Sequence, residues 1–168
     1  MTVATEKIQR ATEIVAKYTL AASATGAVPV PASSAAIVVE NGIMLAHLAD
    51  ALGTSSITVG TVTSSMGFAG FLNLTGRAVF MEGAKLLSWG TGSFWAAIML
   101  STLGASTAGV QTCIIGRIAI EIGKNHGKAL KGRKGGRIIE EAKTDYDAFI
   151  SHWKSKTGTS ASKFGRQG

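Results

Sequence analysis

Apolar side chains recur at spacings of three and four residues along much of the chain, which is the repeat of one helix face. The first such stretch, Thr2–Ala24, has a polar face with acid–base pairs four residues apart. The second begins near Ala32, after two prolines that interrupt the helix, and should stop at Gly53. Further helices are predicted over Phe71–Leu87, Thr107–Leu130 and Arg137–Lys156.

This pattern predicts an all-α protein, in which Ala/Gly-rich helical hairpins form a small bundle with an amphipathic helix at each end. We expect a helical domain over residues 1–130. Residues 131–168 should then hold a basic connector, the last amphipathic helix and a mobile tail from Thr157. A chain of 168 residues is long enough to bury a core of its own.

Three stretches carry no charge and are long enough to consider as membrane spans, since about 20 apolar residues cross the hydrocarbon layer. They are Tyr18–Val39, Ala51–Gly76 and Leu86–Gly116. Prolines interrupt the first and Thr, Ser and Gly dominate the second, so only Phe94–Ile115 approaches the composition of a transmembrane helix. The same run fits a core helix of a soluble bundle, because small residues permit close helix crossings in both settings. Both interpretations stay open.

Small side chains gather in the second half of that run. At these positions two helix backbones can approach closely, so they predict helix packing and self-association of the chain into a homo-oligomer. The residues concerned are Gly104, Ala105, Ala108, Gly109 and Gly116.

The charge is distributed unevenly. Basic and acidic residues cancel up to Gly116, and the whole net charge of +7 follows that residue. Such asymmetry indicates an anionic partner. The residues predicted to bind it are Lys124, Lys128, Lys131, Arg133, Lys134 and Arg137.

Three interpretations of this basic stretch are open. Anionic lipid would be held at about 1 kcal/mol per basic residue near the membrane surface. Nucleic acid is the weaker candidate, because no aromatic residue interleaves the connector Gly127–Arg137 to stack on bases. A solvated linker without a partner is the third.

No set of residues indicates catalysis, a cofactor or a metal ion. The glycine-rich connector lacks the pattern of a phosphate-binding loop. His47, His126 and His152 are far apart in the sequence and have no metal-ligating partners at a suitable spacing. Cys113 stands in an apolar run, where a packed side chain is expected. We therefore expect no enzyme and no cofactor.

Two stretches resemble an uncharacterised bacterial helical domain, the domain of unknown function found in YcjF-type inner-membrane proteins and behind some small GTPase domains. They are Ala21–Gly53 and Gly104–Gly123. The first carries the resemblance through Gly26, Pro29, Pro31, Asn41, Met44, Leu48, Ala49 and Gly53. The resemblance implies a helical hairpin domain, often near membranes, with no catalytic residue to carry over. A GTPase partner would have to come from another chain.

Together these features lead us to expect a non-catalytic, membrane-associated structural or scaffold protein that self-associates through small-residue helix surfaces. It would lie on the cytoplasmic side of a membrane or in the cytoplasm. The alternative is a soluble helical subunit of a protein-only assembly or larger complex. A nucleic-acid adaptor acting through the basic tail is a weaker alternative.

Overall fold

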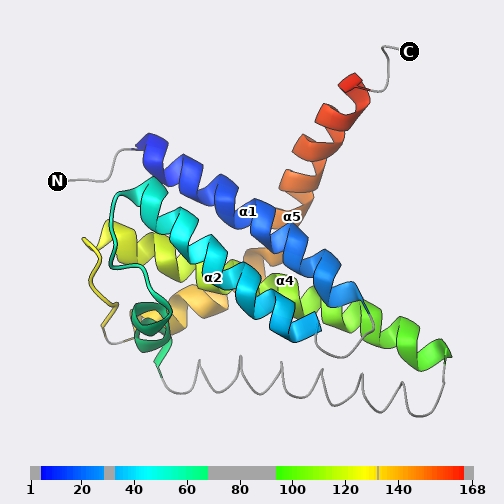
Figure 1. Cartoon of the computed structure of the whole chain (residues 1–168), viewed down its shortest axis with the longest axis horizontal. Helices are drawn as coiled ribbons and strands as arrows, with labels where there is room; N and C mark the ends of the chain where they lie inside the picture. The colour runs from blue at the N-terminus through cyan, green and yellow to red at the C-terminus, as the bar shows by residue number, and fades with distance from the viewer. Residues whose placement is uncertain (1–4, 29–32, 68–93, 132, 165–168) are drawn as a thin grey trace.

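Four long helices make up most of the described chain. The computed structural model describes residues 5–28, 33–67, 94–131 and 133–164, and no strand occurs in these ranges. The long helices are α1 (Thr5–Ala27), α2 (Ser33–Leu52), α4 (Phe94–Lys124) and α5 (Lys134–Phe164), and residues 59–67 are helical as well (Figure 1). The predicted all-α fold is confirmed. The helix predicted over Phe71–Leu87 lies outside the described residues.

Helices α1 and α2 form an antiparallel pair. Thr25 Oγ1 donates a hydrogen bond of 2.8 Å to Glu40 Oε1, and the Tyr18 hydroxyl lies 3.0 Å from His47 Nδ1. The two helices therefore run in opposite directions. The two prolines lie between these helices, as predicted from their effect on the backbone.

Helix α4 packs closely against α1 and α2 through glycines spaced by seven residues. Seven residues make almost two helical turns, so Gly109, Gly116 and Gly123 lie on one face. A Cβ atom on Gly116 would lie 2.5 Å from Val15 Cγ2 of α1. On Gly123 it would lie 2.6 Å from Leu52 Cδ1 of α2. Larger side chains on this face would therefore push the helices apart.

One hydrophobic core joins the helices. Its buried side chains come from α1, α2, α4, α5 and the segment at residues 57–66. The members from α5 are Ile138, Ile139 and Ala142. The core therefore crosses the predicted boundary between residues 130 and 131, and the first half of α5 packs on the same bundle.

The C-terminal half of α5 extends away from the bundle (Figure 1). Among the residues of α5 whose exposure the structure describes, which end at Ser155, the last buried one is Ile150. The helical backbone continues to Phe164. The tail predicted from Thr157 is therefore helical as far as Phe164, and its mobility stays a prediction.

The ends of α2 and α4 share one backbone motif. At the end of α2, Gly53 has a φ of 69°, its N–H donates to the Asp50 carbonyl, and the Thr54 N–H donates to the Ala49 carbonyl. This pair of bonds is a Schellman motif. It confirms Gly53 as the predicted stop.

At the end of α4 the same motif forms around His126, which has a φ of 54°. The Gly127 N–H donates to the Ile122 carbonyl over 2.9 Å and the His126 N–H to the Gly123 carbonyl over 3.2 Å. The helix therefore ends at Lys124, well before the predicted end at Leu130.

Two of the three uncharged stretches do not form a single helix. Tyr18–Val39 contains the end of α1 and the start of α2, and Ala51–Gly76 contains the end of α2 and a turn. Phe94–Ile115 lies within α4. By length and composition, one helical stretch of the described residues, Ala35–Leu52 in α2, could cross a membrane, and 33% of it is buried. Core helices of soluble proteins also meet this criterion.

Candidate anion-binding site

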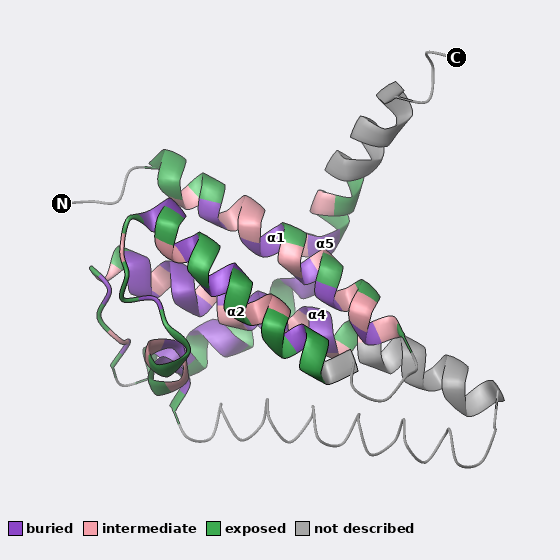
Figure 2. Ribbon diagram, viewed as in Figure 1, coloured by how far each residue is buried: buried purple, intermediate pink, exposed green. Residues whose placement is uncertain are grey.

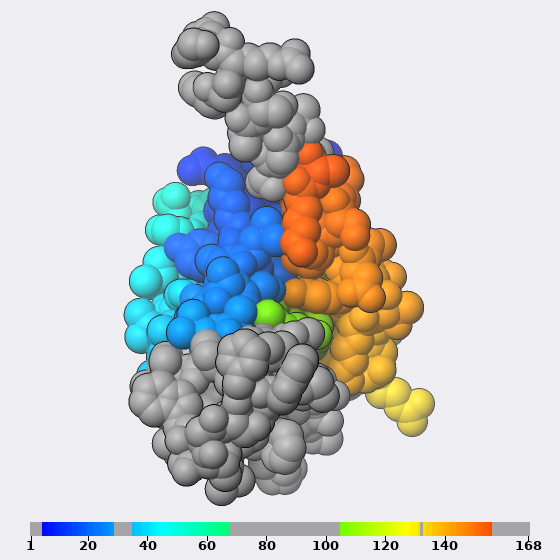
Figure 3. Space-filling model, turned by 90° about the vertical axis from the view of Figure 1, so that its right-hand side faces the viewer, coloured from blue at the N-terminus to red at the C-terminus, as the bar shows by residue number. Residues whose placement is uncertain are grey.

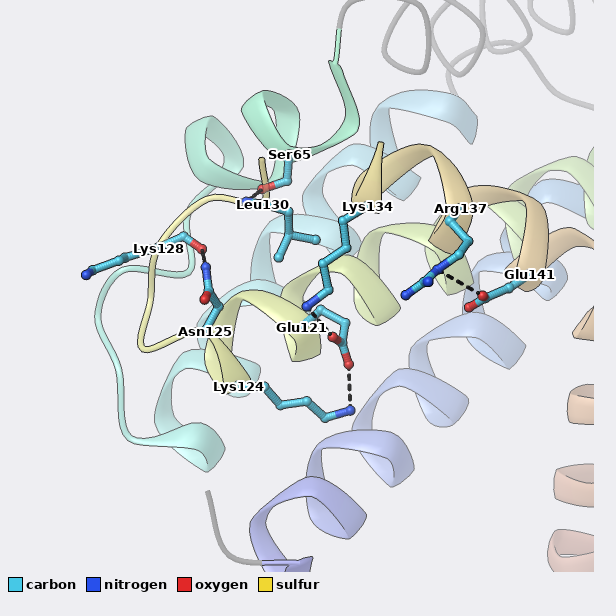
Figure 4. A network of polar contacts seen from close by, with 9 residues as sticks. All are labelled: Ser65, Glu121, Lys124, Asn125, Lys128, Leu130, Lys134, Arg137 and Glu141. Carbon is cyan, nitrogen blue, oxygen red and sulfur yellow. Dashed lines mark hydrogen bonds and ion pairs between the residues drawn. The ribbon is translucent and has the colours of Figure 1, made fainter. Parts of the chain in front are cut away.

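The segment between α4 and α5, residues 125–133, is fixed to the bundle; we call it the α4–α5 connector. The Leu130 N–H donates a hydrogen bond of 2.9 Å to Ser65 Oγ, and the Leu130 side chain is buried (Figure 4). Gly127 packs against Ser56 and Thr54. Gly135, just beyond the connector, lies against the Ser65 carbonyl. These contacts make a freely solvated linker a poor description of this segment.

Ser65 reaches the connector because the helical segment 59–67 is capped locally. The Thr61 N–H donates to Thr58 Oγ1 over 3.2 Å, and the Thr58 N–H donates to Thr61 Oγ1 over 2.9 Å. This reciprocal pair satisfies backbone donors at the helix start, as in a capping box. Ser65 then donates to the Thr61 carbonyl while it accepts from Leu130.

The six predicted anion-binding residues fall into two sets. Lys128, Lys131 and Arg133 are exposed on the connector, and no described residue offers any of them a carboxylate within ion-pair distance. Lys128 points away from the bundle (Figure 4). We call these three the outer cations. The other three form the inner set: Lys124 and Lys134 point toward Glu121, and Arg137 points toward Glu141 (Figure 4).

Glu121 is the centre of this inner set. Its carboxylate lies 2.6 Å from the ammonium group of Lys124 and 3.1 Å from that of Lys134. Burial alone would raise the pKa of Glu121, but hydrogen bonds from the two ammonium groups outweigh it and hold that pKa below its ordinary value. Arg137 Nε lies 3.3 Å from the Glu141 carboxylate.

The inner set borders a groove of about 360 Å³ between α1, α4 and α5. Its charged lining comprises four cations and two carboxylates, namely Arg117, Lys124, Lys134, Arg137, Glu121 and Glu141. Its apolar lining is Ile8, Val15, Ile120 and Ile138. The groove is thus cationic at its polar side and apolar at its floor. Arg117 has a further partner, Asp145, at 3.4 Å, and its guanidinium lies over the Phe149 ring.

The residues predicted for self-association lie mostly inside the molecule. Ala108, Gly109 and Gly116 are buried, Gly109 against Ser23 and Tyr146 and Gly116 against Val15. Ala105 is half-buried, and the surroundings of Gly104 lie outside the described part. Helix packing at these positions therefore takes place within the chain. Contact between copies through them stays a prediction.

Cys113 and His47 belong to residue types that often act in catalysis, but their side chains are buried or hydrogen-bonded. Cys113 is fully buried, and burial raises the pKa of its thiol although the Arg117 guanidinium opposes this effect. His47 Nδ1 is hydrogen-bonded to the Tyr18 hydroxyl. Within the described ranges, no three His, Cys, Asp or Glu residues stand where they could hold a metal ion.

Several residues of interest were missed at the sequence level. The seven-residue spacing could have revealed Gly123, and the spacing of three could have paired Glu121 with Lys124. Ser65 gave no local signal because its partner lies 65 residues away. The outer face of α2 was also missed: Val38, Val39 and Ile43 are 70%, 61% and 46% exposed. Exposed positions recur along this helix (Figure 2).

These features define a small helical bundle with a basic, grooved end. The sequence matches no protein-family model, no curated protein and no solved structure. The resemblance to YcjF-type domains therefore remains an expectation. The basic end and the exposed faces are the features of the molecule that bear on its function.

Proposed function

We propose that this chain is a non-catalytic structural protein that associates with an anionic membrane surface through the α4–α5 connector. The outer cations support this best, because Lys128, Lys131 and Arg133 are exposed and have no carboxylate partner among the described residues. The Leu130–Ser65 contact fixes the backbone that carries them. A preorganised set of charges loses less entropy on binding than a flexible tail.

Vesicle binding tests this proposal. Each basic residue near an anionic membrane contributes about 1 kcal/mol, so replacing all three outer cations by Gln should weaken binding about 100-fold. The measurement is sedimentation with phosphatidylcholine vesicles, with and without phosphatidylserine, at low and high salt. Binding should require phosphatidylserine and decrease as salt screens the charges.

A matched control comes from α1, where Lys7, Arg10 and Lys17 are also exposed. The triple Gln variant at these positions loses the same charge but leaves the connector intact, so its vesicle binding should stay close to that of the original chain. Equal loss in both triple variants would show that only net charge matters. Absence of any binding to phosphatidylserine vesicles would contradict the proposal outright.

A second candidate is a soluble subunit of a protein-only assembly, and the outer face of α2 favours it. Val38, Val39 and Ile43 lie on that face at helical spacing, and a Cβ on Gly42 would meet nothing within 4 Å. In Figure 3 the visible part of the connector (yellow) and α2 (cyan) appear at opposite edges of the view. The connector packs beside Thr54 and Ser56, just beyond the end of α2, whereas the exposed apolar residues lie at positions 38–43 in the first half of that helix. This apolar face is therefore separate from the basic residues.

The occupant we propose for the α2 face is the α2 of a second copy, in antiparallel orientation. Helix α2 contains no Lys or Arg, and its acidic residues are Glu40 and Asp50, so the face does not suit an anionic bilayer. In an antiparallel pair centred near Gly42, Asp50 of each copy approaches the N-terminal end of the other α2. That end carries positive partial charge and has no acidic residue in its first turn.

The variant Val39→Glu tests this contact. Because Val39 is 61% exposed, the fold should tolerate the change, while a buried carboxylate at the contact should disrupt it. Sedimentation equilibrium without lipid should give an oligomer for the original chain and a monomer for the variant. Lys17→Glu on α1 is the control and should stay oligomeric. A monomeric original chain would exclude this candidate.

A further inference from the structure

We propose that the groove between α1, α4 and α5 binds the phosphate group of an anionic amphiphile. Lys124, Lys134 and Arg137 would hold the phosphate, and the apolar floor would take the adjoining part of the acyl chain. The inference rests on the proposed membrane association only for the source of this ligand.

The charge of the groove favours an anionic ligand. Lys124 and Lys134 share one carboxylate, Glu121, so two cations face a single anion. Arg137 has a separate partner, Glu141, and its side chain is 70% exposed, so it can turn toward a ligand. Arg117, the fourth cation of the lining, pairs with Asp145, so the groove keeps an excess of one positive charge. A phosphate supplies the missing negative charge and several acceptor oxygens.

Glu121 lies where its charge would affect the binding of a phosphate. Its lowered pKa keeps it ionised, so it acts as a built-in anion that holds Lys124 and Lys134 near each other. The same carboxylate must repel an incoming phosphate at short range. Removing its charge should therefore tighten phosphate binding, whereas removing a cation should weaken it. This opposite sign distinguishes a built site from general attraction to positive charge.

The shape and lining of the groove favour a phosphate that carries an apolar group. The groove volume of about 360 Å³ falls at the small end of the range for ligand sites. Val15, Ile120 and Ile138 are buried and form part of its floor. A free inorganic phosphate would leave this apolar floor unused, while a phosphate that carries acyl chains through glycerol would cover it.

The test uses the full chain and two soluble probes, inorganic phosphate and a short-chain phosphatidic acid below its micelle concentration. Titration calorimetry should show tighter binding of the phosphatidic acid. Arg137→Gln should weaken that binding about tenfold, as expected for the loss of one charge-assisted contact. Arg137 is well exposed, so this variant should fold, and a thermal melt checks it.

Two further variants complete the design. Glu121→Gln should bind the phosphatidic acid more tightly than the original chain. Lys17→Gln, which removes an exposed cation of α1 that does not line the groove, should leave the affinity unchanged.

The opposite pattern overturns the inference. If Lys17→Gln weakens binding as much as Arg137→Gln, or if Glu121→Gln weakens it, the groove is not a specific site. If inorganic phosphate binds as tightly as the phosphatidic acid, the groove does not recognise an amphiphile. If the variants do not change the affinity for phosphatidic acid while the chain still binds vesicles, the groove is refuted as a binding site and the proposed function stands. Binding of phosphatidic acid without any vesicle binding would refute the proposed function and leave the groove in place.

Discussion

Gly116 illustrates how one residue sets the distance between two helices. It lies on α4 where Val15 of α1 reaches the backbone, and the valine methyl groups occupy the space that a side chain would need. Valine is restricted at χ1, so it cannot easily turn away. Close packing of α1 on α4 thus depends on the absence of one methyl group.

The prediction at this position concerns Gly116→Ala. Helix propensity favours Ala over Gly by about 1 kcal/mol, but overpacking a core costs about 1–3 kcal/mol. We expect net destabilisation, measured by urea unfolding, and partial recovery when Val15→Ala is added. Gly42→Ala is the control: its Cβ would meet nothing within 4 Å, so it should stabilise the protein by about 1 kcal/mol. A stabilising Gly116→Ala would contradict the close packing.

Residue identity predicted the basic site only in part. All six predicted cations lie between the last residue of α4 and the first turn of α5, but sequence could not divide them into an inner and an outer set. That division depends on where Glu121 meets Lys134, which is brought there by the turn between α4 and α5. That turn depends on His126, which adopts a positive φ; such a φ is uncommon outside glycine, although histidine is among the residues enriched there.

At the scale of elements, helix type was predictable and helix length less so. The apolar spacing correctly indicated α1, α2 and α5, since one face of each packs on the core. Gly53 marked the end of α2 because glycine adopts a positive φ without strain. Helix α4 was predicted to start near Thr107 yet begins at Phe94, because an evenly apolar stretch has no periodic signal.

Helix α2 shows why periodicity can mislead. Ile37, Met44 and Leu48 face the core, while Val38, Val39 and Ile43 face outward. A helix that is apolar on both sides buries only one of them within a small bundle. Which side is left exposed follows from how α1 and α4 pack against it, and the sequence of α2 alone does not say.

At the scale of the whole molecule, Cys113 reports on the integrity of the bundle. It is the single cysteine of the chain and lies fully buried on α4, near Tyr146 and Ile150 of α5. Burial raises the pKa of its thiol, so little reactive thiolate forms in the folded state. Access to this thiol requires α5 to separate from α4.

We therefore predict slow labelling of Cys113 by a thiol reagent under native conditions. The rate should follow the population of opened molecules and rise steeply with denaturant as the bundle unfolds. Stopped-time labelling followed by mass spectrometry measures it. Rapid native labelling, with the far-ultraviolet circular dichroism unchanged, would mean that α5 detaches locally from α4.

The sequence by itself determined the helical class, the approximate positions of α1, α2 and α5, and the basic character of one end. These features are local, because each depends on side-chain spacing or charge within a short stretch. Only the tertiary structure decided that Gly109 and Gly116 pack inside the molecule, that Ser65 fixes the connector, and that four cations line one groove. Each of those contacts joins residues far apart in the chain, and no short-range pattern encodes such pairings.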